Sequence, residues 1–399
     1  MNRPSFVLRD GLFLIGTKFE ESDLRVENGF ISEIGPGLQS KPGESSYSLH
    51  GACVIPALIN SHDHLEFNLF PQLGRPPYKN YAEWGMDIQR NYRSEIESIL
   101  RIPLRTRLLW GAYKNILSGV TTVVHHNPYY YHFRWGFPID VYKDYVWIHS
   151  LEFGKSIPKK IRANTKRLIM HAAEGVDEIA SKEISKIAAA GALTDQTILV
   201  HGVGITDSDI ALLTNSGTSL VWCPGSNDFL FQSTAPIKKL HGKIQVALGT
   251  DSTLTGGISL FDELRKARAA SSLSPMELLH MVTSVPAKMF GLTKGMIAVG
   301  SPADLLIYES DSLHPAETFL NLSPSRIICL IRNGSPLFAQ MSHELLFRHS
   351  HRNYSRMLVD GKEMLVAGNL PRIKGVINRF IPDSVFNHFN VQSLNKEPI

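Results

Sequence analysis

The spacing of apolar residues changes twice along the chain. Over about the first fifty residues, apolar and polar positions alternate, and the pairs Asp10-Gly11 and Asn28-Gly29 interrupt the alternation. A period of two is typical of strands that bury one face, and these dipeptides are typical of hairpin turns. The sequence therefore predicts short antiparallel strands at the start of the chain.

From residue 51 onward the chain carries short, continuous apolar runs instead. Seven runs are strand-like, namely ACVIPALIN, GVTTVVHH, YVWIHSL, RLIMHAAE, TILVHG, SLVWCP and IQVALGTD. Several are separated by segments with a helical period, among them TRLLWGAYKNILS, DEIASKEISKIAAAG and SDIALLTNSG. Continuous apolar strands that alternate with helices indicate a parallel sheet covered on both faces. We expect an eighth strand between residues 127 and 166, where the pattern is poor.

After about residue 295 the strand pattern returns, in GMIAVGSPADLLIY, RIICLIRNGSPLF and MLVDGKEMLVAG. The two ends of the chain resemble each other more than they resemble the middle. We predict an α/β fold in which residues 51–295 form a TIM-type (β/α)8 barrel. Residues 1–50 and 296–370 together form a small β-sandwich domain, and residues 371–399 form a C-terminal extension without a clear period.

Composition and charge exclude several classes of protein. The chain has 399 residues and a net charge of only +4, with no block of five or more like charges, so we expect no nucleic-acid partner. Its three cysteines are far apart, which favours a reducing, cytoplasmic setting over a disulfide framework. No stretch approaches the roughly 20 apolar residues of a spanning helix. We therefore expect a soluble protein with no membrane partner and no signal peptide.

Histidines and carboxylates stand at the ends of the expected strands. The first such run ends in His62 and His64, and later runs end in residues of the same kind: His171 with Glu174 close behind, His201, and Asp251. Residues two apart in an extended segment project to the same side, so both histidines of the first pair can reach one ion. A β/α barrel places its active site at the carboxyl ends of its strands. Imidazole and carboxylate without thiolate suit zinc or ferrous iron.

A lone histidine at a strand end is more often a structural residue than a metal ligand. The HSH run at His349–His351 illustrates this, because it lies in a polar stretch that no apolar strand precedes, and we predict that it is surface. The metal prediction therefore rests on four separate strand ends that carry the same chemistry, and not on any single residue.

At these same positions the sequence resembles a known family. VIPALINSHDHL is similar to the first-strand motif of the amidohydrolase superfamily, in particular its chlorohydrolase/cytosine deaminase-like branch. HAAEG, LVHGVGIT, WCPGSNDFLF and GTDSTLTGGISLFDELRKA match that branch in order and approximate spacing. GVTTVV corresponds to its second strand, and SPADLLIY to the return into the small domain. The resemblance covers about residues 6–368.

The resemblance implies a role for each of these residues. One divalent metal ion, zinc in preference to Fe(II), would be held by His62, His64, His171 and Asp251. Asp251 would also accept a proton from the attacking water, His201 would hydrogen-bond that water or the developing oxyanion, and Glu174 would carry protons to the substrate nitrogen. No lysine clearly ends a strand in the region of the fourth strand, so we expect one metal ion and no carbamylated lysine.

Three positions depart from the family pattern. Asp63 separates the first two histidines where a small residue is usual, Trp222 stands where histidine is frequent, and Gly225 stands where arginine is frequent. The last two lie near the substrate in the family, so the usual substrates are not implied. Candidates for substrate contact, each with packing as the alternative reading, are Asn68, Trp84, His125, Trp222 and Asn227.

The resulting functional hypothesis is a metal-dependent hydrolase of non-peptide C–N bonds that deaminates an amino heterocycle or cyclic amidine. The alternative within the enzyme class is hydrolytic ring opening or dehalogenation of a similar heterocycle. A non-catalytic binding protein on an inactivated barrel is a further hypothesis, which the presence of both Glu174 and Asp251 disfavours. The expected partner is a small-molecule substrate, and homodimers are frequent in the family that the chain resembles.

Overall fold

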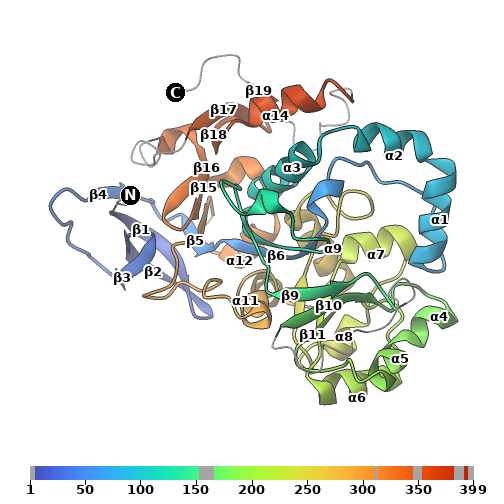
Figure 1. Cartoon of the computed structure of the whole chain (residues 1–399). Coiled ribbons are helices and arrows are strands. Elements are labelled where there is room, and N and C mark those ends of the chain that lie inside the picture. The colour runs from blue at the N-terminus through green and yellow to red at the C-terminus, as the bar shows by residue number, and fades with distance from the viewer. Residues whose placement is uncertain (1–4, 152–165, 311–312, 345–352, 382–390, 394–399) are drawn as a thin grey trace.

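A computed structural model describes residues 5–151, 166–310, 313–344, 353–381 and 391–393. Its central feature is a barrel of parallel strands surrounded by helices (Figure 1). The barrel strands are β6 (Leu58–Asp63), β7 (Val120–His125), β8 (Asp140–Val141), β9 (Tyr145–Ile148), β10 (Arg167–Ala172), β11 (Thr197–His201), β12 (Ser219–Trp222) and β13 (Val246–Leu248). The predicted (β/α)8 barrel is confirmed.

The last barrel strand meets the first, and this contact closes the barrel. Asp63 and Asp251 form a parallel bridge, and the backbone N–H of Thr250 donates to the carbonyl of His62 at 3.0 Å. Gly249 makes the approach possible, because a Cβ there would lie 2.6 Å from the Cβ of His62. The carboxyl ends of β6 and β13 therefore lie side by side.

One strand prediction needs correction, and the expected eighth strand is present but short. The run ACVIPALIN is divided at Ala57 into β5 (Cys53–Pro56), which pairs outside the barrel, and β6. The expected eighth strand is β8, which is only two residues long. Only residues 142–144 separate β8 from β9, which leaves no room for a helix between them. A strand this short carries no recognisable period, which is why the sequence pattern there is poor.

The helices are amphipathic or short and cover the outside of the barrel. TRLLWGAYKNILS lies in α3, SDIALLTNSG lies in α6, and DEIASKEISKIAAAG is divided into α4 and α5 at Lys182. The helices are α1 (Tyr81–Asn91), α2 (Arg93–Leu100), α3 (Leu104–Ile116), α4 (Glu178–Ser181), α5 (Glu183–Ala189), α6 (Asp207–Ser216), α7 (Pro224–Phe231), α8 (Ile237–Leu240), α9 (Leu260–Ala270), α10 (Pro275–His280), α11 (Ser284–Phe290), α12 (Pro315–Leu320) and α14 (Leu370–Ile377).

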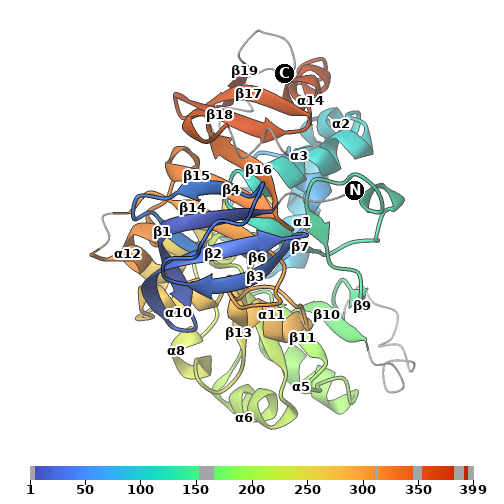
Figure 2. The ribbon, with the colours of Figure 1, turned by 90° about the vertical axis from the view of Figure 1, so that its left-hand side faces the viewer.

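The two ends of the chain pair in one eleven-stranded sheet, as the repeated strand pattern predicted (Figure 2). Its path is β19-β17-β18-β16-β15-β14-β5-β1-β2-β3, with β4 beside β1. The strands are β1 (Phe6–Ile15), β2 (Lys18–Glu27), β3 (Phe30–Gly35), β4 (Ser45–Ser48), β5, β14 (Leu305–Tyr308), β15 (Ile327–Arg332), β16 (Ser335–Gln340), β17 (Tyr354–Val359), β18 (Lys362–Ala367) and β19 (Val391–Ser393). The division of the chain into domains at residues 50, 295 and 370 stays a prediction.

One of the two predicted hairpin turns is wrong. Asn28-Gly29 does connect β2 to β3, with both residues at positive φ. Asp10-Gly11 instead lies inside β1, where the register with β2 shifts between Leu8 and Gly11. An extra residue at positive φ followed by a return to pairing is a β-bulge, and a dipeptide that suits a turn also suits a bulge.

Further sequence predictions concern the cysteines, membrane-spanning helices and the C-terminal extension. Cys53, Cys223 and Cys329 are buried, and none of these three described thiols forms a disulfide bond. Among the described residues, no helix combines the length and apolar character needed to cross a membrane. The C-terminal extension contributes α14 and β19, while His349–His351 lie outside the described residues.

A buried lysine connects the barrel to the terminal sheet. The Nζ of Lys294 lies 2.6 Å from Asp140 at β8 and 2.8 Å from Asp304, whose side chain is 2% exposed. Asp304 also accepts from the hydroxyl of Thr121 and the backbone N–H of Asn333. The lysine therefore compensates a carboxylate that has no access to water.

We expect Lys294→Met to lower the free energy of unfolding by about 3 kcal/mol, because it leaves the charge of Asp304 buried without its cation. Denaturant titration followed by circular dichroism measures this change. Lys288→Met, at an exposed position nearby, is the control. Equal stability of the two variants would contradict the role of Lys294.

Candidate metal and active site

Buried imidazoles from several strands converge at the carboxyl end of the barrel. His62 and His64 come from the end of β6 and His171 from the end of β10. The Nε2 atoms of His62 and His171 are 3.2 Å apart, and the rings of His62 and His64 are 5.0 Å apart. The structure thus brings together the three histidines that the resemblance proposed as metal ligands.

Asp251 completes this group from the loop after β13. Its Oδ1 lies 3.5 Å from Nε2 of His64 and 3.7 Å from Nε2 of His62. Asp251 has φ of +55°, and His201 at the end of β11 has φ of +74°. Non-glycine residues rarely adopt this conformation, and such strain concentrates at functional sites.

His126 lies within reach of the same centre, although it was not among the predicted metal ligands. This residue follows β7 directly, and its ring lies 4.3 Å from that of His171 and 5.1 Å from that of His62. His62, His126 and His171 can offer three nitrogens that all lie within 4.8 Å of one another. His62, His64 and Asp251 can likewise offer two nitrogens and one carboxylate oxygen within that distance. His125 and His126 are adjacent at the end of the second barrel strand, and only His125 was selected as a candidate, for substrate contact.

The nitrogens of these rings fit a divalent metal ion. Nδ1 of His62, His64 and His171 and both ring nitrogens of His126 are buried without a hydrogen-bond partner. Burial, together with neighbouring imidazoles, holds the pKa of His64, His126 and His171 well below the usual range, so these rings are neutral and able to ligate. The pKa of Asp251 is low despite burial, because imidazoles surround it, and a cation would compensate its buried charge.

Glu174 and His201 lie beside the cluster. Burial raises the pKa of Glu174 well above its usual value, and the charges of Asp251 and Glu183 raise it further, which favours the protonated form of this carboxyl group. Its Oε1 lies 3.6 Å from Nε2 of His201. Burial lowers the pKa of His201 to about 4, so this ring is neutral. A proton donor and a neutral imidazole therefore adjoin the candidate metal ligands.

Asn227 orients His201. The Nδ2 group of Asn227 donates to the carbonyl of His201 at 3.3 Å, so its Oδ1 faces Nδ1 of the ring at 3.0 Å. An amide oxygen can only accept, which places the proton of the neutral ring on Nδ1 and leaves Nε2 as an acceptor. Asn227 thus contacts the candidate catalytic histidine through both ends of its amide.

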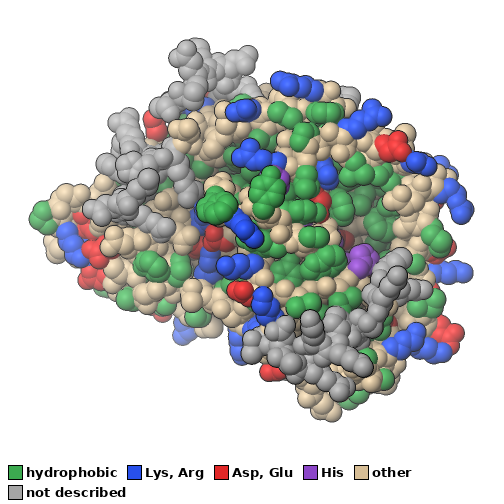
Figure 3. Space-filling model, viewed as in Figure 1, with side chains coloured by type: hydrophobic (Ala, Val, Ile, Leu, Met, Phe, Trp, Pro, Cys, Tyr) green, Lys and Arg blue, Asp and Glu red, His purple; other side chains and the backbone are tan. Residues whose placement is uncertain are grey.

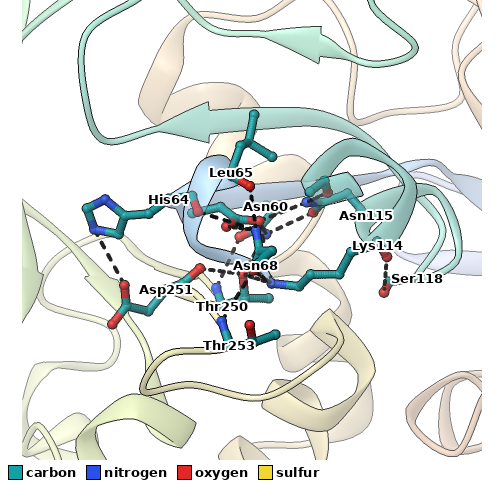
Figure 4. A network of polar contacts seen from close by, with 12 residues as sticks. Asn60, His64, Leu65, Asn68, Lys114, Asn115, Ser118, Thr250, Asp251 and Thr253 are labelled. Atoms are coloured by element: carbon teal, nitrogen blue, oxygen red, sulfur yellow. Dashed lines mark hydrogen bonds and ion pairs between the residues drawn. The ribbon is translucent and has the colours of Figure 1, made fainter. Parts of the chain in front are cut away.

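The structure explains why an aspartate, Asp63, stands between the two histidines of the motif. Because side chains alternate along a strand, it points away from His62 and His64 into a buried polar network. Asn68, Lys114 and Asn115 of this network are shown in Figure 4. It accepts hydrogen bonds from Asn68 and Asn115, each at 2.7 Å, and Nζ of Lys114 lies 3.6 Å from it. The network anchors the strand end that carries the two histidines.

The structure also explains why residue 225 is a glycine where arginine is frequent. A Cβ at this position would lie 2.2 Å from Oε1 of Glu263, whose side chain is buried against the loop. The carboxylate of Glu263 accepts from the backbone N–H of Gly225 at 2.6 Å and from that of Gly257 at 2.8 Å. The first turn of α7 and the loop after β13 are therefore held together by one carboxylate, which leaves no space for an arginine at residue 225.

The first turn of α7 and the loop after β13 orient Asp251. Its Oδ2 accepts from the hydroxyl of Ser226 at 2.8 Å and from that of Thr255 at 2.6 Å. With Oδ2 engaged in this way, Oδ1 is the oxygen that faces His62 and His64. Outer-shell hydrogen bonds of this kind orient ligands and tune metal sites.

Most of the residues proposed for substrate contact are engaged elsewhere. Asn68 belongs to the network around Asp63, and Trp84 donates to the carbonyl of Leu73. His125 faces Glu66, and the fully buried Trp222 donates to Thr234. Asn227 holds His201. Their positions do not support direct contact with a substrate. Side chains alternate in direction along a strand, which explains why His125 faces Glu66.

The comparisons with known proteins agree with this geometry. Residues 148–337 match the model of the Amidohydrolase family. A protein named 5-methylthioadenosine/S-adenosylhomocysteine deaminase from Pyrococcus furiosus is 26% identical over 402 residues, which cover 82% of this chain and 91% of that protein. A protein of the same name from Halobacterium salinarum is 36% identical over 149 residues, 35% of each chain.

Solved structures share the fold over nearly the whole chain. An adenosine deaminase from Xanthomonas campestris with bound zinc has a TM-score of 0.73 at 16% identity, covering 96% of this chain and 99% of that one. Atrazine chlorohydrolase from Arthrobacter aurescens in complex with zinc has a TM-score of 0.71 at 18% identity, covering 94% and 100%. Over residues 148–337 the chain is similar to the Amidohydrolase family, and it shares its fold with these solved structures.

We expect Ser226→Ala and Thr255→Val each to weaken zinc affinity by about tenfold or more, because each removes one hydroxyl donor to Asp251. Competition with a chromophoric chelator measures the affinity. Ser208→Ala, at an exposed position, is the matched control. Wild-type zinc affinity in both variants would show that the hydroxyls do not orient this ligand.

We expect the metal-free protein to lose stability as the pH falls below about 6.5. Where a folded histidine has a lowered pKa, the unfolded chain binds the proton first, and each such group costs about 1.4 kcal/mol per pH unit. Carboxyl groups with raised pKa values act in the opposite sense but are fewer among the described residues, namely Glu66, Glu174, Glu263 and Asp360. The described histidines with lowered values are His64, His125, His126, His149, His171, His201, His280 and His343.

Denaturant titrations of chelator-treated protein at pH 7.5 and 5.5 test this expectation. His126→Phe, which removes a ring without hydrogen bonds, should lose less stability between the two values than the wild type does. The exposed His241→Asn should behave as the wild type. Equal acid sensitivity of His126→Phe and wild type would contradict the assigned pKa direction.

Proposed function

We propose that this protein is a metal-dependent deaminase of an amino heterocycle and that its metal is zinc. The observation that carries the proposal is the placement of Glu174, His201 and Asp251 around convergent imidazoles, with the pKa of Glu174 raised and those of His201 and Asp251 lowered. The Pyrococcus furiosus relative, named a deaminase, supports it because the similarity spans most of both chains. The zinc in the two solved structures supports the choice of metal.

The metal ligands in this proposal are His62, His64, His171 and Asp251, with His126 as an additional nitrogen in reach. Bound there, the ion would supply a Lewis acid and lower the pKa of a bound water towards about 7. Glu174 also lines a cavity of about 360 Å³ together with Tyr81 and Lys186. None of the candidate metal ligands is among the described residues that line this cavity, so it adjoins the proton donor without reaching the metal ligands.

The side chains can complete the proton transfers of a deamination. Asp251 accepts a proton from the attacking water as the water oxygen bonds to the ring carbon that carries the amino group. Glu174 donates its proton to the adjacent ring nitrogen. The amino nitrogen then takes the proton from Asp251 and leaves as ammonia, and Glu174 recovers a proton from the new C–O–H group. The product carries a carbonyl, and both carboxyl groups return to their initial states.

His201 orients the water in this scheme. Its Nδ1 proton is committed to Asn227, so Nε2 can accept an O–H of the attacking water. Of the two roles that the family resemblance implies, this geometry favours orientation of the water over donation to the oxyanion.

The test is ammonia release from a panel of aminopurines, aminopyrimidines, triazines and cyclic amidines, beginning with 6-aminopurine nucleosides because of the named relatives. We expect zinc-loaded protein to release ammonia from at least one member, and a chelator to abolish the release. Glu174→Gln should lower the rate by about 10²–10⁴-fold while zinc content is retained. Glu277→Gln, at an exposed helix start, is the control.

Each outcome discriminates between the hypotheses. A Glu174→Gln variant with wild-type turnover would contradict the mechanism. Asp251→Ala that still binds a full equivalent of zinc would contradict the ligand set. Chloride release from chlorotriazines without ammonia release would favour dehalogenation instead.

A further inference from the structure

A second cavity lies outside the barrel and away from the metal ligands. It is about 630 Å³ in volume and is bounded by α3, the loop at residues 136–138, the end of β15 and the start of α14. α3 and α14 lie side by side in Figures 1 and 2, so residues far apart in the sequence build it. No residue of the metal cluster lines it, and its volume is typical of small-molecule sites.

Among the described residues, the charged lining of this cavity is entirely cationic: Arg105, Arg332 and Arg372 line it, and no aspartate or glutamate does. The side chains of Arg105 and Arg372 are exposed and make no hydrogen bond or ion pair with the described part of the chain. Arg332 lies 3.5 Å from Asp140, but its Nε is buried without a hydrogen-bond partner. Guanidinium donors around this cavity therefore remain available.

The rest of the lining is mainly apolar. Leu109 and Tyr113 contribute from α3, Phe137 from the loop, and Ile373 and Val376 from α14. Figure 3 shows basic side chains among hydrophobic ones over α3 and α14. An apolar wall beside unpaired guanidinium groups suits a ligand that has an anionic head and an apolar body. An inorganic anion would leave the wall uncovered, and a neutral apolar molecule would leave the guanidinium groups unpaired.

We propose that this cavity binds an amphipathic anion, a carboxylate or phosphate monoester on a short apolar chain. Arginine is the residue best suited to these heads, because its planar guanidinium donates two parallel hydrogen bonds to one carboxylate or phosphate. Arg105 and Arg372 hold the head, and the side chains of α3 and α14 contact the body. The site is independent of the proposed deaminase activity.

Titration calorimetry with hexyl phosphate and with hexanoate, each on the full-length zinc-loaded protein, tests the proposal. We expect saturable binding of at least one of them, and their relative affinity identifies the head group. Inorganic phosphate and hexanol should each bind at least tenfold more weakly than the preferred probe. The double variant Arg105→Gln/Arg372→Gln should lose at least tenfold in affinity, with an unchanged melting temperature.

Arg101→Gln, at an exposed arginine near the start of α3 but outside the cavity lining, is the matched control and should bind as the wild type does. Three outcomes overturn the proposal: no saturable binding of either probe, equal binding of inorganic phosphate, or wild-type affinity in the double variant. Ammonia release should be unaffected in all of these variants, which separates this test from that of the deaminase.

Discussion

The side chain of Asn60 joins the first barrel strand to the loop after the last one. Its Oδ1 accepts from the backbone N–H of Thr250 at 3.1 Å, and its Nδ2 donates to the hydroxyl of the same residue at 2.9 Å. Gly249 lets the two backbones approach, and the result is that Asp251 and His64 lie within 3.5 Å. Without this contact the carboxylate and the imidazoles would belong to separate strands with no common centre.

The sequence could predict the fold and much of the site, because both follow from position along strands. A polar residue directly after a buried strand must lie at the carboxyl end of the barrel, so His171, His201 and Asp251 could be placed near one another. Which of two adjacent residues faces the axis depends on local register, and β6 and β7 pair with an irregularity between Asn60 and Asp63. For this reason the sequence could not distinguish His126 from His125.

Contacts between distant segments were less predictable. Glu263 lies 38 residues from Gly225, and no local pattern relates them, yet together they determine how Ser226 is presented to Asp251. Likewise, Asn68 was a reasonable candidate for substrate contact in a loop after a barrel strand, but the charge pair of Asp63 and Lys114 draws it inward. The oligomeric state and the cytoplasmic location stay predictions.

The order of strands in the terminal sheet affects how the chain can fold during synthesis. β5 lies between β1 and β14, so the hydrogen-bonding groups on one of its edges find their partner only in residues 305–308. Since β6 begins only two residues after β5 ends, the strand that carries His62 and His64 follows directly from this unfinished edge. While the chain is being translated, an apolar strand edge therefore stays unpaired until about three quarters of the protein has been made, a period in which pairing with another chain is a hazard.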